Sequence, residues 1–150
     1  MPHDLATSAS PTEVAGALRP VLMKLNRELR RETATFGVTG GQAALLHLIR
    51  RSPGIGVRTL AARERISPAS MSVAVTRLEK AGLVTRTADP LDRRRQALWV
   101  TEQGDRILRT VRTRRTAWLA ARLKRLTPEQ LAAVEAAIEP LSELLEDDTA

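Results

Sequence analysis

The stretch SPASMSVAVTRLEKAGLVTRTADPLDRRRQALWVT, residues 67–101, decides the fold of this 150-residue chain. It begins as a helix, because Ser67 can cap the first turn and Pro68 stands at the first helical position. Apolar side chains then recur at gaps of three and four and share one helical face: Met71, Ala74, Val75 and Leu78. Gly82 ends this pattern. We therefore expect a helix that buries one face and presents a small, hydroxyl-rich face outward.

The second half of the stretch predicts a β-hairpin, or wing. Residues 83–86 (LVTR) are strand-like, residues 89–92 (DPLD) have turn composition, and residues 96–100 alternate well enough for a second strand. Three consecutive arginines, 93–95, stand at the expected tip. Trp99 should point away from Leu98 and Val100, and the sequence leaves its role open.

The residues before this stretch predict two further helices. A capping box at 39–42 opens the first, whose expected buried face is Ala44, Leu45, Leu48 and Ile49. Residues 57–64 form the second, with Leu60 and Ala61 inward. Two short helices joined by a tight turn and followed by a hairpin predict a winged helix-turn-helix over residues 38–101.

Longer helices flank this domain. Residues 10–34 begin with a capping box at Ser10, and Pro20 should kink their helix or delay its firm start. Residues 103–146 comprise a long helix capped by Thr101 and a last helix that opens with a box at 127–130. We expect a single domain over 1–150, mainly α with a small β-wing, with residues 1–9 as a disordered tail. The last helix carries an apolar stripe at seam spacing, which should be covered in a dimer: Leu131, Val134, Ile138, Leu141 and Leu145.

Composition narrows the function. Residues 1–126 hold all 24 Lys and Arg against 10 acids, whereas residues 127–150 hold 7 acids and no Lys or Arg. A basic body favours an anionic partner, although an arginine-rich genome would give the same composition. The absence of cysteine excludes disulfides, thiolate metal sites and cysteine redox sensing. We expect no metal, cofactor or membrane partner and a cytoplasmic location, since no apolar run approaches the roughly 18 residues of a membrane span.

Three motifs resemble the MarR (multiple antibiotic resistance regulator) family. DPLDRRRQALWVTEQG, residues 89–104, is similar to that family's wing, and SMSVAVTRLEKAGLV, residues 70–84, to its recognition helix. VTGGQ, residues 38–42, resembles the start of its second helix, and the likeness covers about residues 14–145. The resemblance implies a homodimer, built from the first helix and the last two, whose winged domains read a pseudo-palindromic operator. Repression is the family's commoner mode.

The resemblance also implies roles for single residues. Arg94 would enter the minor groove, Asp92 would orient it, and Val73, where the family often has a polar or basic residue, would offer an apolar base contact. The complete set of DNA-binding residues expected is Ser70, Ser72, Val73, Thr76, Arg77, Arg86, Asp92, Arg93, Arg94 and Arg95. A charged, solvated helix face and hairpin tip remain the alternative.

A small-molecule effector would bind between the winged domain and the dimer helices, as the resemblance implies. The candidate lining residues are Phe36, His47 and Trp118, although His47 could be a plain surface residue and Trp118 a packing residue. An enzyme is not expected, since neither a serine–histidine arrangement nor metal-ligand spacing is present. An RNA-binding module needs stacking aromatics, and the chain has only one Phe, two Trp and no Tyr. A salt-titrated comparison of duplex DNA with single-stranded RNA separates a DNA-binding regulator from an RNA-binding module.

Overall fold

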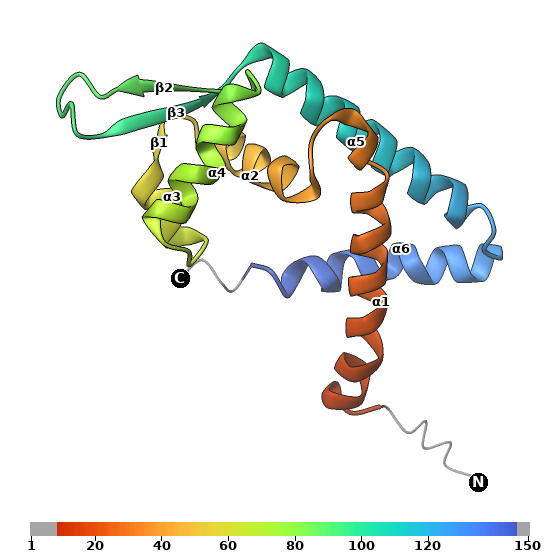
Figure 1. Cartoon of the computed structure of the whole chain (residues 1–150). Helices are drawn as coiled ribbons and strands as arrows, with labels where there is room; N and C mark the ends of the chain where they lie inside the picture. The colour runs from red at the N-terminus through yellow and green to blue at the C-terminus, as the bar shows by residue number, and fades with distance from the viewer. Residues whose placement is uncertain (1–8, 147–150) are drawn as a thin grey trace, which may run out of the picture.

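The computed structural model describes residues 9–146 (Figure 1). The expected tail over residues 1–9 therefore lies almost entirely outside the described residues. The elements, in chain order, are α1 (Pro11–Arg31), a 3-10 turn η1 (Ala34–Phe36), α2 (Gly40–Arg51), β1 (Ile55–Gly56), α3 (Val57–Arg63), α4 (Pro68–Lys80), β2 (Val84–Ala88), β3 (Gln96–Val100), α5 (Glu102–Leu123) and α6 (Pro128–Glu143). The mainly helical fold with a small wing is confirmed.

Local hydrogen bonds confirm the predicted starts of five helices. Ser10, Thr39 and Thr127 each form a complete capping box with the side chain three residues later. Ser67 caps α4 and Thr101 caps α5 through their hydroxyl groups. Each cap satisfies a backbone N–H that the helix itself cannot pair. α1 runs as one helix from Pro11 to Arg31, with Pro20 inside it.

The core lies in the winged domain, between α2, α3, α4, the sheet and the first half of α5. Met71, Val75 and Leu78 are fully buried in it, as predicted for the helix from Pro68, and the fourth predicted residue, Ala74, is half-buried. The predicted face of α2 is confirmed in part: Ile49 is buried and Leu45 and Leu48 are half-buried against the core, whereas Ala44 is exposed and the unpredicted Ala43 and Leu46 are buried. Because α2 is apolar around most of its circumference, periodicity cannot choose the face that α5 and β3 cover.

The sheet has three antiparallel strands in the order β1-β3-β2. β2 pairs with β3 from Val84 opposite Val100 to Ala88 opposite Gln96, so it begins and ends later than the predicted 83–86. β1 was not predicted, because two residues cannot show the alternation that marks a strand. Its pairing of Ile55 with Leu98 closes the sheet onto the core.

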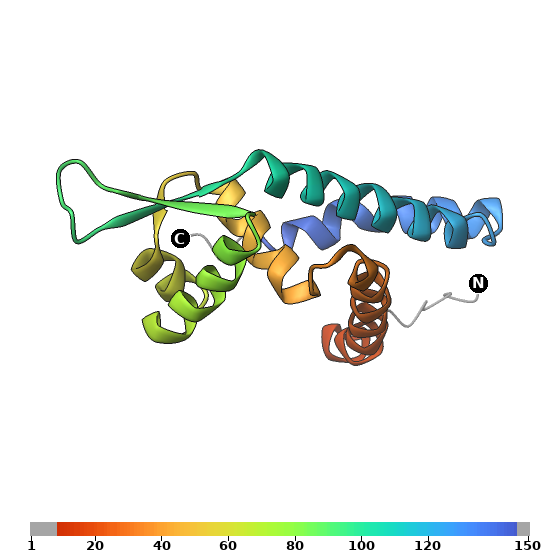
Figure 2. The same ribbon diagram turned by 45° about the horizontal axis from the view of Figure 1, so that its top comes forward.

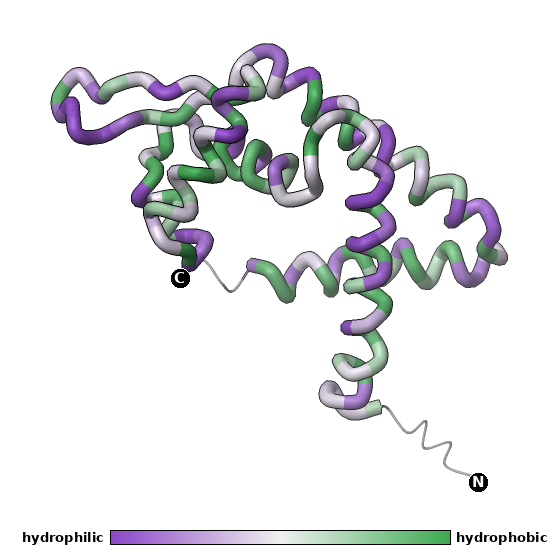
Figure 3. Tube along the Cα trace, in the orientation of Figure 1, coloured by the Kyte–Doolittle hydropathy of each residue, from purple (hydrophilic) through white to green (hydrophobic). Residues whose placement is uncertain are grey.

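α1, α5 and α6 extend away from the winged domain on the side opposite the wing (Figure 2). Neither α1 nor α6 has a buried residue. The tube coloured by hydropathy shows apolar residues along both helices (Figure 3). The exposed apolar residues of these two segments include Val14, Val21, Leu22 and Leu25 in the first and Leu131, Val134, Ile138 and Leu145 in the second. Over residues 9–146, no helix is apolar enough along its length to cross a membrane.

Arg115 ties α5 to the end of α1. Its Nε donates to the Leu29 carbonyl oxygen at 3.3 Å, and its Nη2 lies 3.4 Å from the hydroxyl oxygen of the buried Thr33. Burial lowers the pKa of Arg115, and the neighbouring Arg30 lowers it further. One arginine of α5 therefore contributes its side chain to the packing of α1.

Candidate nucleic-acid interface

The outward face of α4 is built from the residues that the sequence predicted. Ser70, Val73 and Arg77 are exposed, and the Val73 side chain is 54% accessible even though it is apolar. The capping hydroxyl of Ser67 accepts the Ser70 backbone N–H at 3.1 Å and also contacts its hydroxyl group at 2.9 Å. The start of α4 is thus fixed in place while its small side chains stay open to a partner.

The wing tip is ordered by two aspartates. The Asp92 Oδ1 accepts the backbone N–H of Arg94 at 3.0 Å, and the Asp89 Oδ1 accepts that of Leu91 at 2.9 Å. The Asp89 N–H in turn donates to the Arg95 carbonyl oxygen at 2.9 Å, closing the loop. Asp92 therefore acts on Arg94 through the backbone, and its nearest guanidinium is that of Arg95 at 4.0 Å.

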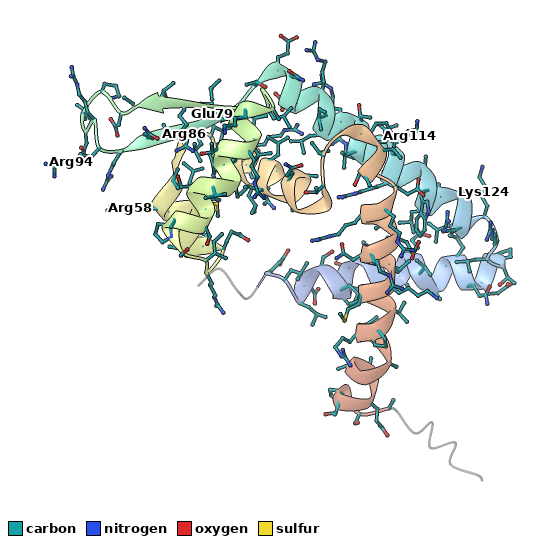
Figure 4. The ribbon with its side chains drawn as sticks, in the orientation of Figure 1. Arg58, Glu79, Arg86, Arg94, Arg114 and Lys124 are labelled. Carbon is teal, nitrogen blue, oxygen red and sulfur yellow. The ribbon has the colours of Figure 1, made fainter. Side chains whose placement is uncertain are left out.

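A basic hollow of about 1070 Å³ lies under the wing, between the hairpin, β1 and the starts of α3 and α4. Arginines 58, 63, 86, 94 and 95 line it together with Asp89 and Asp92. Figure 4 labels Arg94 at the wing tip and Arg58 below it on the same side of the molecule. This concentration of cations over a concave surface suits a polyanion.

Sequence reasoning missed Arg58 and Arg63 at this hollow. Both stand on α3, the helix that precedes the recognition helix, and nothing in the spacing of α3 sets them apart from the other arginines. The Nη1 of Arg63 donates to the Ser52 hydroxyl oxygen at 2.9 Å, which fixes it against the end of α2. The general docking of a helix-turn-helix, in which the first helix crosses the DNA backbone, is the signal that could have found them.

Two predicted DNA-binding residues face the protein interior more than the sequence suggested. The Thr76 hydroxyl donates to the Ser72 carbonyl oxygen at 2.8 Å and accepts from the Arg86 guanidinium at 2.7 Å. Arg86 also contacts Glu79 and Gln96, and its side chain is only 17% exposed. Arg77 and arginines 93–95 are, by contrast, open to solvent.

Trp99 has a role on the other face of the hairpin. Its ring covers Gly54, where a Cβ atom would come within 3.2 Å of the ring carbons, and its Nε1 donates to the Thr87 hydroxyl oxygen at 2.8 Å. The side chain is 42% exposed, as expected for a residue that points away from Leu98. It holds the base of the wing to the turn after α2.

The three candidate effector residues lie apart from the hollow under the wing. His47 is exposed on α2, Phe36 lies under the Arg114 guanidinium at 5.0 Å, and Trp118 lies under that of Arg122 at 3.5 Å. Over residues 9–146, none of the three lines the hollow under the wing or the shallower ones on α1 and α5. Their assignment to an effector site stays a prediction.

Comparison with known proteins agrees with the winged helix-turn-helix geometry described above. Residues 38–95 match the family model described as the MarR family. An HTH-type transcriptional regulator of Mycobacterium bovis is 32% identical over 117 residues, which cover 78% of this chain and 82% of that protein. The HTH-type transcriptional repressor MdtR of Bacillus subtilis is 28% identical over 80% of this chain and 77% of its own.

A solved structure extends the likeness over the whole fold. The crystal structure of a MarR-family protein of Mycobacterium tuberculosis in complex with p-aminosalicylic acid is 25% identical, with a TM-score of 0.66 over 89% of this chain and 99% of that one. The Mycobacterium bovis and Bacillus subtilis relatives are named as regulators of transcription and not as enzymes. With the basic hollow, the exposed face of α4 and the wing in place, the chain belongs to the MarR family of transcriptional regulators.

Proposed function

We propose that this regulator binds duplex DNA sequence-specifically at the basic hollow under the wing. The observation that carries the proposal is that one concave surface holds Arg94 and Arg95 of the wing, Arg58 and the start of α4. α4 would lie in the major groove, with Ser70, Ser72 and Val73 near base edges and Arg77 toward a phosphate. Arg94, beside Arg93 and Arg95 on the hairpin, would reach the adjacent minor groove, where the negative potential favours a guanidinium.

The apolar character of Val73 suggests one element of sequence preference. A valine methyl cannot accept or donate a hydrogen bond, so its favourable partner in the major groove is the methyl group of thymine. Asp92 supports the minor-groove contact because it fixes the backbone at Arg94 in place.

We further propose that the working unit is a homodimer. The exposed apolar residues of α1 and α6 would be buried between two copies, since so many uncovered apolar side chains are costly in water. Charge favours the same arrangement: α1 carries Arg19, Arg27, Arg30 and Arg31, whereas α6 carries Glu135, Glu139 and Glu143. Two winged domains would then read half-sites about one helical turn, or 34–36 Å, apart.

Repression and its release by a small molecule complete the proposal. MdtR, the Bacillus relative, is named as a repressor, and the related Mycobacterium tuberculosis protein was solved with an aromatic acid bound. An effector site at the junction of the winged domain and the dimer helices, near Phe36, His47 and Trp118, would couple ligand binding to the spacing of the two winged domains. Trp118→Phe should then change ligand-dependent release without changing unliganded DNA binding.

The test is DNA binding by the full chain as a function of salt. Duplex fragments selected from the host genome are labelled, and binding is followed by fluorescence anisotropy between 50 and 200 mM salt. If about 6–8 phosphates are neutralised, affinity should fall by roughly three to four decades over this range. A flat salt response, or equal affinity for a single-stranded RNA of the same length, would refute the proposal.

A pair of variants locates the site. Arg94→Ala should weaken operator binding by about 1–3 kcal/mol per half-site. Lys124→Ala removes a charge at the far end of α5, away from the hollow (Figure 4), and should leave the affinity nearly unchanged. Equal losses for both variants would show that net charge, rather than the hollow, governs binding.

A further inference from the structure

Arg86 occupies a different environment from the other arginines of the hollow. From the middle of β2, its guanidinium points at α4, where Nη2 lies 2.7 Å from the Thr76 hydroxyl oxygen and 3.3 Å from the Ser72 carbonyl oxygen. Its Nη1 donates to the Gln96 Oε1 on β3 at 3.2 Å. Its Nε lies 3.4 Å from a carboxylate oxygen of Glu79 (Figure 4). One side chain thus joins the recognition helix to both long strands of the wing.

Burial and charge distinguish this arginine from a free DNA-binding cation. The Arg86 side chain is 17% exposed, whereas that of Arg95 is 81% exposed. Glu79 offsets its charge, so little is left to attract phosphate. A guanidinium that turned toward DNA would give up hydrogen bonds on α4 and β3 and leave the carboxylate of Glu79 unpaired.

We propose that Arg86 is a positioning residue: a strut that fixes the angle between the wing and α4, so that both reach the same DNA together. This inference rests on the DNA-binding function proposed above and changes the role expected for Arg86 from contact to support. A planar guanidinium suits the task, because its fixed fork of donors can reach several acceptors at once, whereas a lysine ammonium is a single point charge.

The two faces of the hairpin are held by different contacts at the base of the wing. Arg86 is paired with Leu98 across the hairpin, so its side chain leaves on the core-facing side. Trp99 leaves on the other side and packs on Gly54. The hairpin is therefore held from both faces at its base, and only its tip projects free. Loss of the strut would free the wing to tilt relative to α4 while Trp99 still anchors it.

The experiment is a double-variant cycle in operator binding. Arg86→Lys keeps the charge but loses the fork, so we expect binding to weaken by about 5- to 30-fold, nearly as much as in Arg86→Ala. In the Arg86→Lys protein, adding Arg94→Ala should weaken binding by at most about threefold, much less than in the parent chain, because the wing tip is no longer placed on the DNA. Arg77→Lys is the matched control, since Arg77 lies exposed on α4, outside the strut. In the double variant Arg77→Lys with Arg94→Ala, the fold losses of affinity of the two single variants should multiply.

The cycle separates the strut from its alternatives. If Arg86 contacted DNA directly, Arg86→Lys would retain most of the operator affinity. If Arg86 only stabilised the fold, the fold losses of affinity of Arg86→Lys and Arg94→Ala would multiply in the double variant. Either result overturns the proposal.

If the parent chain binds no duplex DNA, the proposed function fails, and the strut is judged by hydrogen exchange. Amides of residues 84–88 should then exchange faster in Arg86→Lys than in Arg77→Lys. Equal exchange in the two variants would refute the strut.

Discussion

Replacing Gly104 with alanine should destabilise the protein, although alanine is the better helix former. Gly104 is buried at the start of α5, where its N–H donates to the capping hydroxyl of Thr101 at 3.0 Å. A Cβ atom at this position would overlap the carbonyl oxygen of Leu83 and come within 2.7 Å of a Val100 methyl carbon. That carbonyl oxygen cannot easily withdraw, because it accepts the Thr101 N–H at 3.0 Å.

The magnitude follows from two opposing effects. Forcing a methyl group into a packed backbone contact costs about 1–3 kcal/mol or more, and here both neighbours are fixed, so the upper end applies. The gain in helix propensity offsets about 1 kcal/mol of this cost. The net loss in the free energy of unfolding should be about 2 kcal/mol, which for a chain of this size lowers the Tm by roughly 4–8 °C.

The measurement is urea unfolding followed by circular dichroism at one fixed protein concentration, because the stability of a dimer depends on concentration. Gly41→Ala is the matched control. It also lies in a helix, but its Cβ would make only an ordinary contact at 3.9 Å with the Thr39 hydroxyl oxygen. Gly41→Ala should leave stability equal or raise it by up to about 1 kcal/mol. If Gly104→Ala behaves like Gly41→Ala, the close approach of α5 to residue 83 does not constrain the fold.

Three further outcomes test other parts of the molecule. Asp92→Ala should weaken operator binding by about three- to tenfold, because the bond that fixes the Arg94 backbone is lost; tighter binding, as expected from removing a negative charge near DNA, would contradict the orienting role. Ile138→Glu on α6 should convert the dimer to monomers in sedimentation, and an unchanged dimer would exclude the α6 stripe from the interface. The hydrogen bonds of Ser10 lower the pKa of Glu13, so its contribution to stability should be present at neutral pH and be lost as the pH falls through that lowered pKa. The Tm of Glu13→Gln should therefore fall less on acidification than that of the parent chain. The same fall in Tm for both proteins would show that the charge of Glu13 in the capping box does not contribute to stability.

The sequence predicted most of the fold because most of its boundary signals are local. The caps at Ser10, Thr39, Ser67, Thr101 and Thr127 all involve hydrogen bonds to a residue three positions later, so they are written within a single helical turn. The hairpin was predictable for the same reason, since its turn and its arginines are contiguous. The buried face of α2 was predicted only in part, because several sides of this helix are apolar and the packing of α5 and β3 decides which side is covered.

The candidate site likewise combines features that local sequence predicts with features that only tertiary packing fixes. The sequence by itself determined the recognition helix with its open, hydroxyl-rich face and the arginines of the wing tip, because periodicity and turn chemistry act over a few residues. Only the tertiary structure decided that Arg86 binds Thr76, Glu79 and Gln96 and that Arg58 and Arg63 join the wing around one hollow. An arginine has the same local pattern whether its guanidinium meets water, DNA or another part of its own chain. The partner of Arg86 is fixed only when residues seven or more positions apart in the chain are packed together. That packing, rather than the local pattern, distinguishes a supporting arginine from one that contacts DNA.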